Sequence, residues 1–286
     1  GDVCMKNLMQ LKDLIKNLAK EKNINSQVLL KNYMMQRLLL KIRNSDYKNN
    51  FILKGGMLVA DLVGLESRST VDMDLTIKSF NLTKENITEV FTEIFSSKTE
   101  NGIEFKLKQV ENIREEAEYK GFRLSILALM GQARIPLKID LTTGDKMTPS
   151  EINYRYQLLF EDEKIEILSY NLETLLAEKL ETIVSRSKTN TRMRDFYDVY
   201  ILTLEFKEKI NMNLLADALN KTATNRETYK SIKNGSSIIN DIFNSDIILN
   251  HWNRYRNKFQ YAKNIEFSEL KEEIIKLWNV IEDKGM

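Results

Sequence analysis

Two aspartates, Asp72 and Asp74, alternate with apolar residues in the stretch VDMDLTIK, residues 71–78. Such alternation predicts a β-strand, on which residues i and i+2 point to the same face. The two carboxylates would then project together, while Met73 and Leu75 point into the core. Adjacent carboxylates suit hard cations with oxygen ligands, such as Mg²⁺ or Mn²⁺. A solvated strand face is the alternative explanation of the same pattern.

A pair of glycines, Gly55 and Gly56, precedes the aspartates and ends the stretch FILKGG. We predict a short buried strand that ends at these glycines and a short helix over residues 57–63. A glycine turn at a helix N-terminus offers backbone N–H groups and the positive end of the helix dipole to a phosphate. Tight turns also need glycine for their geometry alone. Followed by an acidic pair, the turn is interpreted as a phosphate site beside a metal site.

A third carboxylate is expected from a later strand. In RIPLKIDLT, residues 134–142, apolar residues alternate with polar ones up to Asp140. Asp140 therefore lies on the face opposite Ile135, Leu137 and Ile139 and shares its own face with Lys138. It is either part of the same site as the acidic pair or an ordinary acid at a strand end.

A lysine lies within the apolar stripe of a predicted helix. The stretch NLETLLAEKLETIVSRSK, residues 171–188, begins with Asn171 as the N-cap and places Lys179 beside Leu175 and Leu176. A lysine in such a stripe either extends to the surface or meets an anion in a cleft. Both interpretations remain open from the sequence.

The segment from Lys179 to Arg194 carries five cations against one acid, Glu181. A local excess of this kind is typical of sites that bind a polyphosphate or an RNA backbone. The following helix places Asp195 and Asp198 three residues apart. An exposed pair between Arg194 and Asp198, which would contribute little to stability, is the alternative to a functional role.

A second basic stretch, HWNRYRNKFQYAK, spans residues 251–263 and contains four cations and no acid. Aromatic residues interleaved with cations can stack bases and neutralise phosphates. However, Trp252, Tyr255 and Phe259 also follow helical spacing, which favours a buried stripe. The sequence therefore predicts a core role for these aromatics, with cations on the other face that could guide RNA.

Composition limits the remaining possibilities. The chain has 286 residues, 29% of them charged, and a formal net charge of only +2, so a polyanion site requires local clustering. The single histidine, His251, excludes a histidine-rich zinc site, and the single cysteine, Cys4, excludes an internal disulfide and fits a reducing compartment. No signal-peptide pattern and no run of about 18 apolar residues is present. We therefore predict a cytoplasmic protein without a membrane segment.

Periodicity predicts an α+β fold. We expect two helices first, over residues 5–20 and 27–43, and a further helix in TKENITEVFTEIF with Thr83 as its N-cap. From residue 103 to 170 the period changes to two, which predicts strands over residues 103–113, 122–130, 134–142, 154–160 and 164–170. Everything from Asn171 onward has helical periodicity. The expected domains are residues 1–170, with a mixed sheet, and residues 171–286, which are helical.

These motifs carry a resemblance to known families. A glycine pair, then D-x-D on the next strand, then a lone aspartate on a later strand, resembles the nucleotidyltransferase superfamily of the DNA polymerase β type. More narrowly, KGGMLVADL and RSTVDMDL together with LLAEKLETIVSRSK and RMRDFYDVY resemble the AbiEii family, the nucleotidyltransferase toxins of bacterial type IV toxin–antitoxin and abortive-infection systems. The resemblance spans residues 51–204. Gly56 departs from the serine that many superfamily members have, so phosphate contact would rest on backbone N–H groups.

The resemblance implies a site and a reaction. It implies a polymerase β-like core whose helical C-terminal domain completes the active-site cleft. The implied metal ligands are Asp72, Asp74 and Asp140, and Lys179 and Asp198 are implied as further catalytic residues, with Asp195 at the edge of the site. The nucleotide-binding residues would be Lys54, Gly55, Gly56, Arg68, Lys179 and Arg194.

The same resemblance implies Mg²⁺ or Mn²⁺ as cofactor and an NTP as substrate. The nucleoside monophosphate would pass to an acceptor hydroxyl at the 3′ end of tRNA, which would inhibit translation and bacterial growth as a phage defence. A cognate antitoxin that regulates transcription is implied, without stable contact to the toxin. The alternatives are an enzyme that nucleotidylates protein and a non-catalytic module of the same fold that binds nucleotide or RNA.

Overall fold

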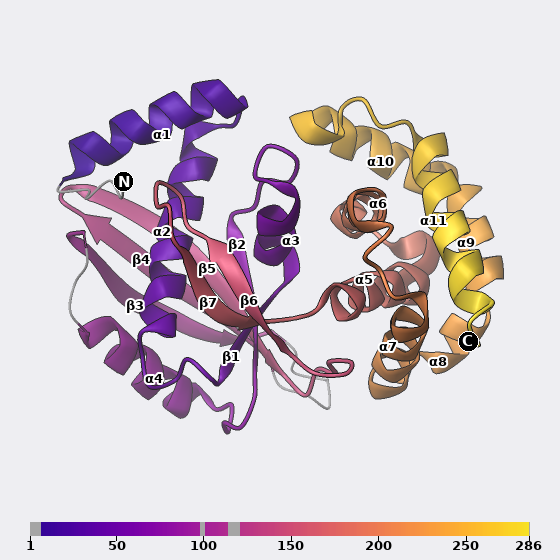
Figure 1. Ribbon diagram of the computed structural model, residues 1–286, viewed down its shortest axis with the longest axis horizontal. Coiled ribbons are helices and arrows are strands. Elements are labelled where there is room, and N and C mark those ends of the chain that lie inside the picture. Colours follow the sequence, from indigo (N-terminus) through magenta and orange to yellow (C-terminus); the bar gives the residue numbers. More distant parts are fainter. Residues whose placement is uncertain (1–6, 98–100, 114–120, 286) are drawn as a thin grey trace. The chain divides into compact units, whose positions relative to one another are not determined.

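The computed structural model describes residues 7–97, 101–113 and 121–285 (Figure 1). It consists of two compact units. The first contains residues 1–144 and 152–169, and the second contains residues 145–151 and 170–286. The second unit thus also includes a short segment that lies between two strands of the first.

A mixed seven-stranded sheet forms the first unit, in the order β3-β4-β5-β2-β1-β7-β6. β2 is antiparallel to β1 and parallel to β5, and β1 is parallel to β7. The strands are β1 Phe51–Lys54, β2 Asp72–Ile77, β3 Ile103–Asn112, β4 Gly121–Met130, β5 Ala133–Thr143, β6 Ile152–Gln157 and β7 Lys164–Ser169. The α+β prediction is therefore confirmed.

Four helices belong to the same unit: α1 Leu8–Lys22, α2 Ser26–Arg43, α3 Gly55–Val63 and α4 Lys84–Ser96. α2 contacts the sheet at β5 and β7, and α4 contacts it at β3. Thr83 is the N-cap of α4, as expected, because its side-chain oxygen accepts a hydrogen bond from the backbone N–H of Asn86. Met5, at the expected start of the first helix, and Cys4 lie outside the described residues.

Two expected boundaries are wrong. β6 ends at Gln157, because the chain turns at residues 158–160 and Phe160 adopts a φ of +65°. Helix α3 begins at Gly55 rather than after the glycines. Gly55 has a φ of +66°, which lets the chain change direction within one residue. The glycines therefore form the first turn of the helix rather than a separate turn before it.

The second unit is helical, as predicted. Its helices are α5 Leu172–Arg186, α6 Met193–Phe206, α7 Met212–Asn225, α8 Tyr229–Lys233, α9 Gly235–Phe243, α10 Asp246–Lys258 and α11 Phe267–Glu282. Asn171 caps α5 by accepting from the N–H of Thr174. Within the described parts of the chain, no helix combines the length and the apolar character needed to cross a membrane.

The aromatic stretch of α10 is only partly as expected. Trp252 is fully buried, which confirms its core role, whereas Tyr255 and Phe259 are half-buried. Although the stretch itself contains no acid, Arg256 pairs with one that follows it in the chain. Its guanidinium binds both oxygens of Glu266, with Nη2 donating to Oε1 at 2.6 Å. Glu266 lies three residues beyond the basic stretch, and the chain turns between the two residues so that their side chains meet.

Candidate active site

A row of charged residues crosses four strands of the sheet. Asp74 on β2 lies opposite Lys54 on β1 and opposite Asp140 on β5. Asp140 in turn lies opposite Arg123 on β4. Residues that lie opposite each other in a sheet share a face, so all four belong to one face. In this row, two acidic side chains therefore lie between two basic side chains.

Asp72 extends this row toward the start of β2. It lies opposite Lys138 on β5, two residues before Asp140. The face therefore carries three carboxylates and three basic side chains. Met73 and Leu75 are completely buried, and Asp72 and Asp74 are half-buried. The predicted alternation of the strand is thus confirmed, and Asp140 shares its face with the pair.

Arg123 and Asp140 form a two-point ion pair. Nε donates to Oδ1 at 2.8 Å and Nη2 donates to Oδ2 at 2.7 Å. The hydrogen bonds to Asp140 raise the pKa of Arg123, and the charges of Asp140, Asp72 and Asp74 raise it further. Arg123 is not among the residues that the sequence patterns indicated. Its only signal was a cation in the alternating stretch FRLSILALM, whose neighbouring strand the sequence does not specify.

Gly55 allows Asp74 to approach the start of α3. A Cβ at Gly55 would overlap the carboxylate of Asp74, and a Cβ at Gly56 would lie 3.0 Å from Oγ1 of Thr70 and 3.1 Å from Nη2 of Arg68. Both glycines therefore have a packing role. The glycine pair and the acidic pair, which the sequence separates by 15 residues, are in contact here.

Two of the candidate nucleotide ligands are buried. Lys54 is 6% exposed and Arg68 is completely buried, with Nη1 donating to the carbonyl of Ser69 at 2.6 Å. Lys54 lies opposite Asp74 in the strand pairing, and Arg68 lies beside Gly56. Both are therefore buried next to the first residues of α3 rather than exposed at the surface.

The acidic pair fits a divalent cation in its donor chemistry. Asp72 and Asp74 supply carboxylate oxygens from one face, and hard cations prefer such ligands. However, within residues 7–97, 101–113 and 121–285 no three acidic, histidine or cysteine side chains are arranged to hold a metal ion together. Asp140, the nearest third donor, has both oxygens bound to Arg123. Only Asp72 and Asp74 therefore offer carboxylate oxygens suited to a divalent cation in this arrangement.

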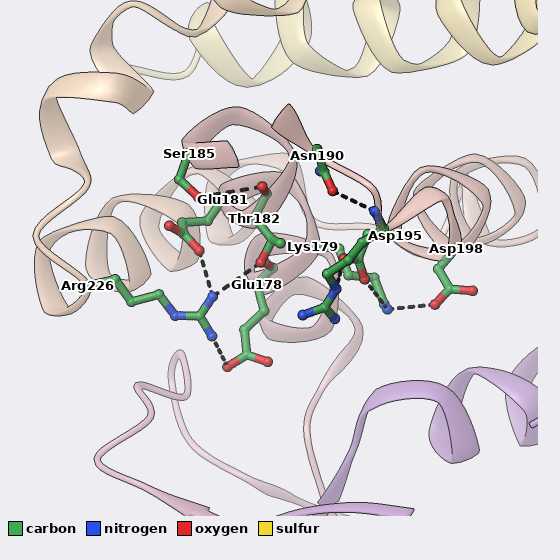
Figure 2. Close-up of polar contacts among 10 residues, drawn as sticks. Glu178, Lys179, Glu181, Thr182, Ser185, Asn190, Asp195, Asp198 and Arg226 are labelled. Atoms are coloured by element: carbon green, nitrogen blue, oxygen red, sulfur yellow. Dashed lines mark hydrogen bonds and ion pairs between the residues drawn. The ribbon is translucent and has the colours of Figure 1, made fainter. Parts of the chain in front are cut away.

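In the second unit, Lys179 joins α5 to α6 (Figure 2). Its Nζ donates to Oδ2 of Asp198 at 2.6 Å and to Oδ1 of Asp195 at 3.4 Å. The side chains of Lys179, Asp195 and Asp198 are 9%, 4% and 0% exposed. Extension of Lys179 to the surface and an exposed Asp198 are therefore both wrong. The anion that Lys179 meets belongs to the protein itself.

Arg192 completes this cluster from the start of α6. Its Nε lies 2.9 Å from Oδ2 of Asp195, as an ion pair whose geometry makes no hydrogen bond. The N–H of Arg192 donates to Oδ1 of Asn190 at 2.8 Å. Arg194, which was also expected to bind nucleotide, directly precedes Asp195 in the chain and is half-buried.

A second ion cluster anchors α5. Arg226, at the end of α7, donates to Oε1 of Glu178 at 2.8 Å and to Oε2 of Glu181 at 2.6 Å (Figure 2). Burial opposes the charge of Arg226, but the two carboxylates outweigh it and raise the pKa of the guanidinium. Glu178 and Glu181 flank Lys179, so both clusters fix the same turn of helix.

The excess cations of the basic segment, which we define as residues 186–192, are on the surface. Arg186, Lys188 and Arg192 are exposed. Lys188 lies 3.7 Å from Asp241, and both side chains are more than half exposed, so this pair is weak. The segment therefore presents positive charge to solvent directly after the helix that carries Lys179.

Similar structures identify the class of fold. The crystal structure of JHP933 from Helicobacter pylori is 17% identical, covers 91% of this chain and 94% of its own, and superposes with a TM-score of 0.51. A candidate nucleotidyltransferase from the same bacterium is 18% identical, covers 91% of this chain and 97% of its own, and gives a TM-score of 0.50. The fold is therefore of the nucleotidyltransferase type.

The family follows from the sequence. The family model described as the nucleotidyl transferase AbiEii toxin of type IV toxin–antitoxin systems matches residues 37–273. The chain belongs to this family, as the motifs around Asp72 and Lys179 predicted. No match was found among the curated proteins.

Proposed function

We propose that this nucleotidyltransferase transfers a nucleoside monophosphate from an NTP to the hydroxyl at the 3′ end of tRNA. The acceptor oxygen forms a bond to the α-phosphorus, the bond to the leaving pyrophosphate breaks, and the hydroxyl proton is lost. The observation that carries the proposal is the set of three carboxylates, Asp72, Asp74 and Asp140, on one face of two paired strands. Charge neutralisation and positioning account for most of the catalysis in such reactions.

Each residue has a proposed role. A divalent cation, Mg²⁺ or Mn²⁺, held by Asp72 and Asp74 would supply positive charge against the triphosphate. Asp140 accepts the proton of the attacking hydroxyl. For Lys179 we propose the role that the family resemblance implies, which is to offset the charge of the triphosphate; its ammonium has three donors, and its contacts with Asp195 and Asp198 use two of them. Asp198 orients Lys179.

RNA is the proposed acceptor because of the basic segment. Arg186, Lys188 and Arg192 are exposed and follow α5 directly. A group of exposed cations in a chain with a net charge of only +2 suits a phosphate backbone. Modification of tRNA in the cytoplasm would stop translation and growth, and the family places such a toxin with a cognate antitoxin. We propose that this antitoxin acts without stable contact.

The test is transfer of label from each α-³²P NTP in turn to total bacterial tRNA, in the presence of Mg²⁺. RNA and protein are resolved on separate gels. The acid-to-amide variant Asp72→Asn/Asp74→Asn should abolish labelling, whereas Asp13→Asn/Asp46→Asn, which removes the same charge from exposed positions, should not. The same two variants should respectively lose and retain growth inhibition when expressed in a bacterial host.

Each other result has a defined meaning. Label on protein alone would replace the acceptor and keep the phosphoryl chemistry. No label on either, with NTP or tRNA binding intact, would contradict a transferase and leave a binding module as the function.

A further inference from the structure

Arg123 is paired with Asp140, the third carboxylate that Asp72 and Asp74 would need to complete a metal site. Its guanidinium meets both oxygens of Asp140 in a planar, two-point arrangement. Charge-assisted pairs of this kind are the strongest hydrogen bonds of the protein repertoire and fix the orientation of the carboxylate. Each oxygen of Asp140 thus has one lone pair engaged by Arg123, and the arginine competes with any cation that approaches the same side of the carboxylate.

Arg123 lies close to all three carboxylates of the face. Asp140 is its partner across β4 and β5, and Asp74 is the next residue in the same row. The charges of Asp72 and Asp74 act on Arg123 together with that of Asp140. Arg123 is therefore placed where a metal ion bound by the three acids would experience its repulsion.

The pair is also able to open. The side chain of Arg123 is 42% exposed and that of Asp140 is 25% exposed. Both side chains are therefore in contact with solvent, and water can hydrogen-bond to them when the pair opens. This contrasts with Lys179 and Asp198, whose side chains are 9% and 0% exposed. Asp140 can thus exchange partners without leaving a buried charge unpaired.

We propose that Arg123 is a positioning residue that holds Asp140 in the free protein and competes with a divalent cation for it. The cation binds first to Asp72 and Asp74, and Asp140 joins it by leaving Arg123. This inference rests on the proposed function only in taking the three carboxylates as the cation site. It explains why these acids are neighbours and yet do not form a ready metal site.

The test measures the affinity of the full-length protein for Mn²⁺ alone, without nucleotide, by electron paramagnetic resonance of the free ion. Arg123→Gln should bind Mn²⁺ about five to ten times more tightly than the natural chain, because a competitor and a repelling charge are removed. Arg134→Gln is the matched control. Arg134 is an exposed arginine of β5, and its loss should leave the affinity unchanged.

A second pair of variants separates competition from simple repulsion. In the Asp140→Asn background, Arg123→Gln should change Mn²⁺ affinity by less than about twofold, because the contested ligand is gone. An equal gain in that background would mean that Arg123 acts through space on Asp72 and Asp74, and would overturn the proposal. Unchanged or weaker binding by Arg123→Gln, or no Mn²⁺ binding by either chain, would overturn it as well.

Two further measurements keep the result interpretable. Circular dichroism and thermal unfolding check that each variant is folded. If Arg123→Gln does not fold, Arg123→Lys carries the test, since it keeps the charge and loses the two-point geometry. It should tighten Mn²⁺ binding by about two- to threefold, and no change would contradict the proposal. The test measures Mn²⁺ binding and not nucleotide transfer. The competition by Arg123 can therefore be confirmed even if the protein transfers no nucleotide, and nucleotide transfer can be confirmed even if Arg123 does not compete.

Discussion

Gly55 combines two constraints that are usually separate. It adopts a φ of +66°, and a carboxylate occupies the place where its Cβ would lie. The first constraint penalises any residue with a side chain, because the left-handed region crowds the Cβ against the backbone. The second penalises it again, because Asp74 must move. The glycine thus determines where a candidate metal ligand points.

Gly55→Ala should therefore destabilise the protein more than a positive φ alone explains. Gly102 is the matched control, since its φ is +65° and nothing lies within 4 Å of its missing Cβ. We expect Gly102→Ala to cost about 1 kcal/mol and Gly55→Ala about 3 kcal/mol, the excess coming from the overlap with Asp74. Urea unfolding of both variants measures the difference, and equal losses would contradict the close approach of Asp74.

At the scale of elements, the pairing of α5 with α6 depends on Lys179. Lys179→Met should destabilise the protein by about 3 to 5 kcal/mol, because the buried Asp198 would lose the ammonium that donates to it, while Asp195 would be left with the exposed Arg192 as a cation. Lys188→Met should change stability by less than about 0.5 kcal/mol, since the pair with Asp241 is exposed. Urea unfolding compares the two lysines. A loss for Lys179→Met as small as that for Lys188→Met would exclude a structural role of the buried pair.

The contact between α3 and β6 predicts a pH dependence. Burial raises the pKa of Asp61 above its ordinary value of 3.8, although Tyr154 Oη, at 2.6 Å, and the N–H of Gln157, at 3.2 Å, donate to it and oppose the shift. The folded protein therefore binds this proton more tightly than the unfolded chain. Its contribution to stability is greatest below the unfolded pKa and falls as pH rises through the folded pKa.

Asp61→Asn should remove this dependence. The difference in unfolding free energy between the natural chain and Asp61→Asn should decrease from about pH 4 upward and level off above the raised pKa. Urea unfolding at several pH values measures it. Tyr154→Phe removes a donor that lowers the pKa of Asp61, so the decrease should extend to higher pH. A difference that is constant with pH would contradict the raised pKa.

The local sequence pattern predicted the individual strands and helices better than it predicted which of them lie side by side. Alternation placed Asp72 and Asp74 on one face and Asp140 on the face of Lys138, because side-chain direction in a strand depends only on adjacent residues. Strand order is not local: β5 lies between β4 and β2, and the 55 residues 78–132 separate β2 from β5 along the chain. The contact of Arg123 with Asp140 follows from that order, as does the contact of Gly55 with Asp74 from the pairing of β1 with β2.

The second unit shows the same limit in a helical setting. Spacing placed Lys179 in the apolar stripe of α5, and this stripe is buried as predicted. Spacing could not show whether its ammonium meets solvent, substrate or protein, since that depends on how α6 packs. The carboxylate of Asp198, 19 residues later, decides it. Arg226, which holds Glu178 and Glu181, lies still further along the chain and had no signal in the sequence.

At the scale of the whole molecule, charge is almost balanced, with 43 basic and 41 acidic residues. A balanced chain attracts RNA only where its cations are concentrated. Long-range attraction is also limited, because physiological salt screens charges beyond about 8 Å. RNA binding should therefore depend on the position of the cations and not on their total number.

The basic segment provides the test. Arg186→Gln/Lys188→Gln/Arg192→Gln should weaken tRNA binding about tenfold at 0.1 M salt and should reduce the slope of log affinity against log salt by about two, close to 0.7 to 0.9 per lost phosphate contact. Lys12→Gln/Lys16→Gln/Lys20→Gln removes three exposed cations from α1 and lowers the net charge equally. This control should leave both quantities unchanged, because binding depends on local charge. Filter binding at several salt concentrations measures both variants, and equal weakening by the two would show that net charge alone attracts RNA and would remove the basic segment from the proposed acceptor site.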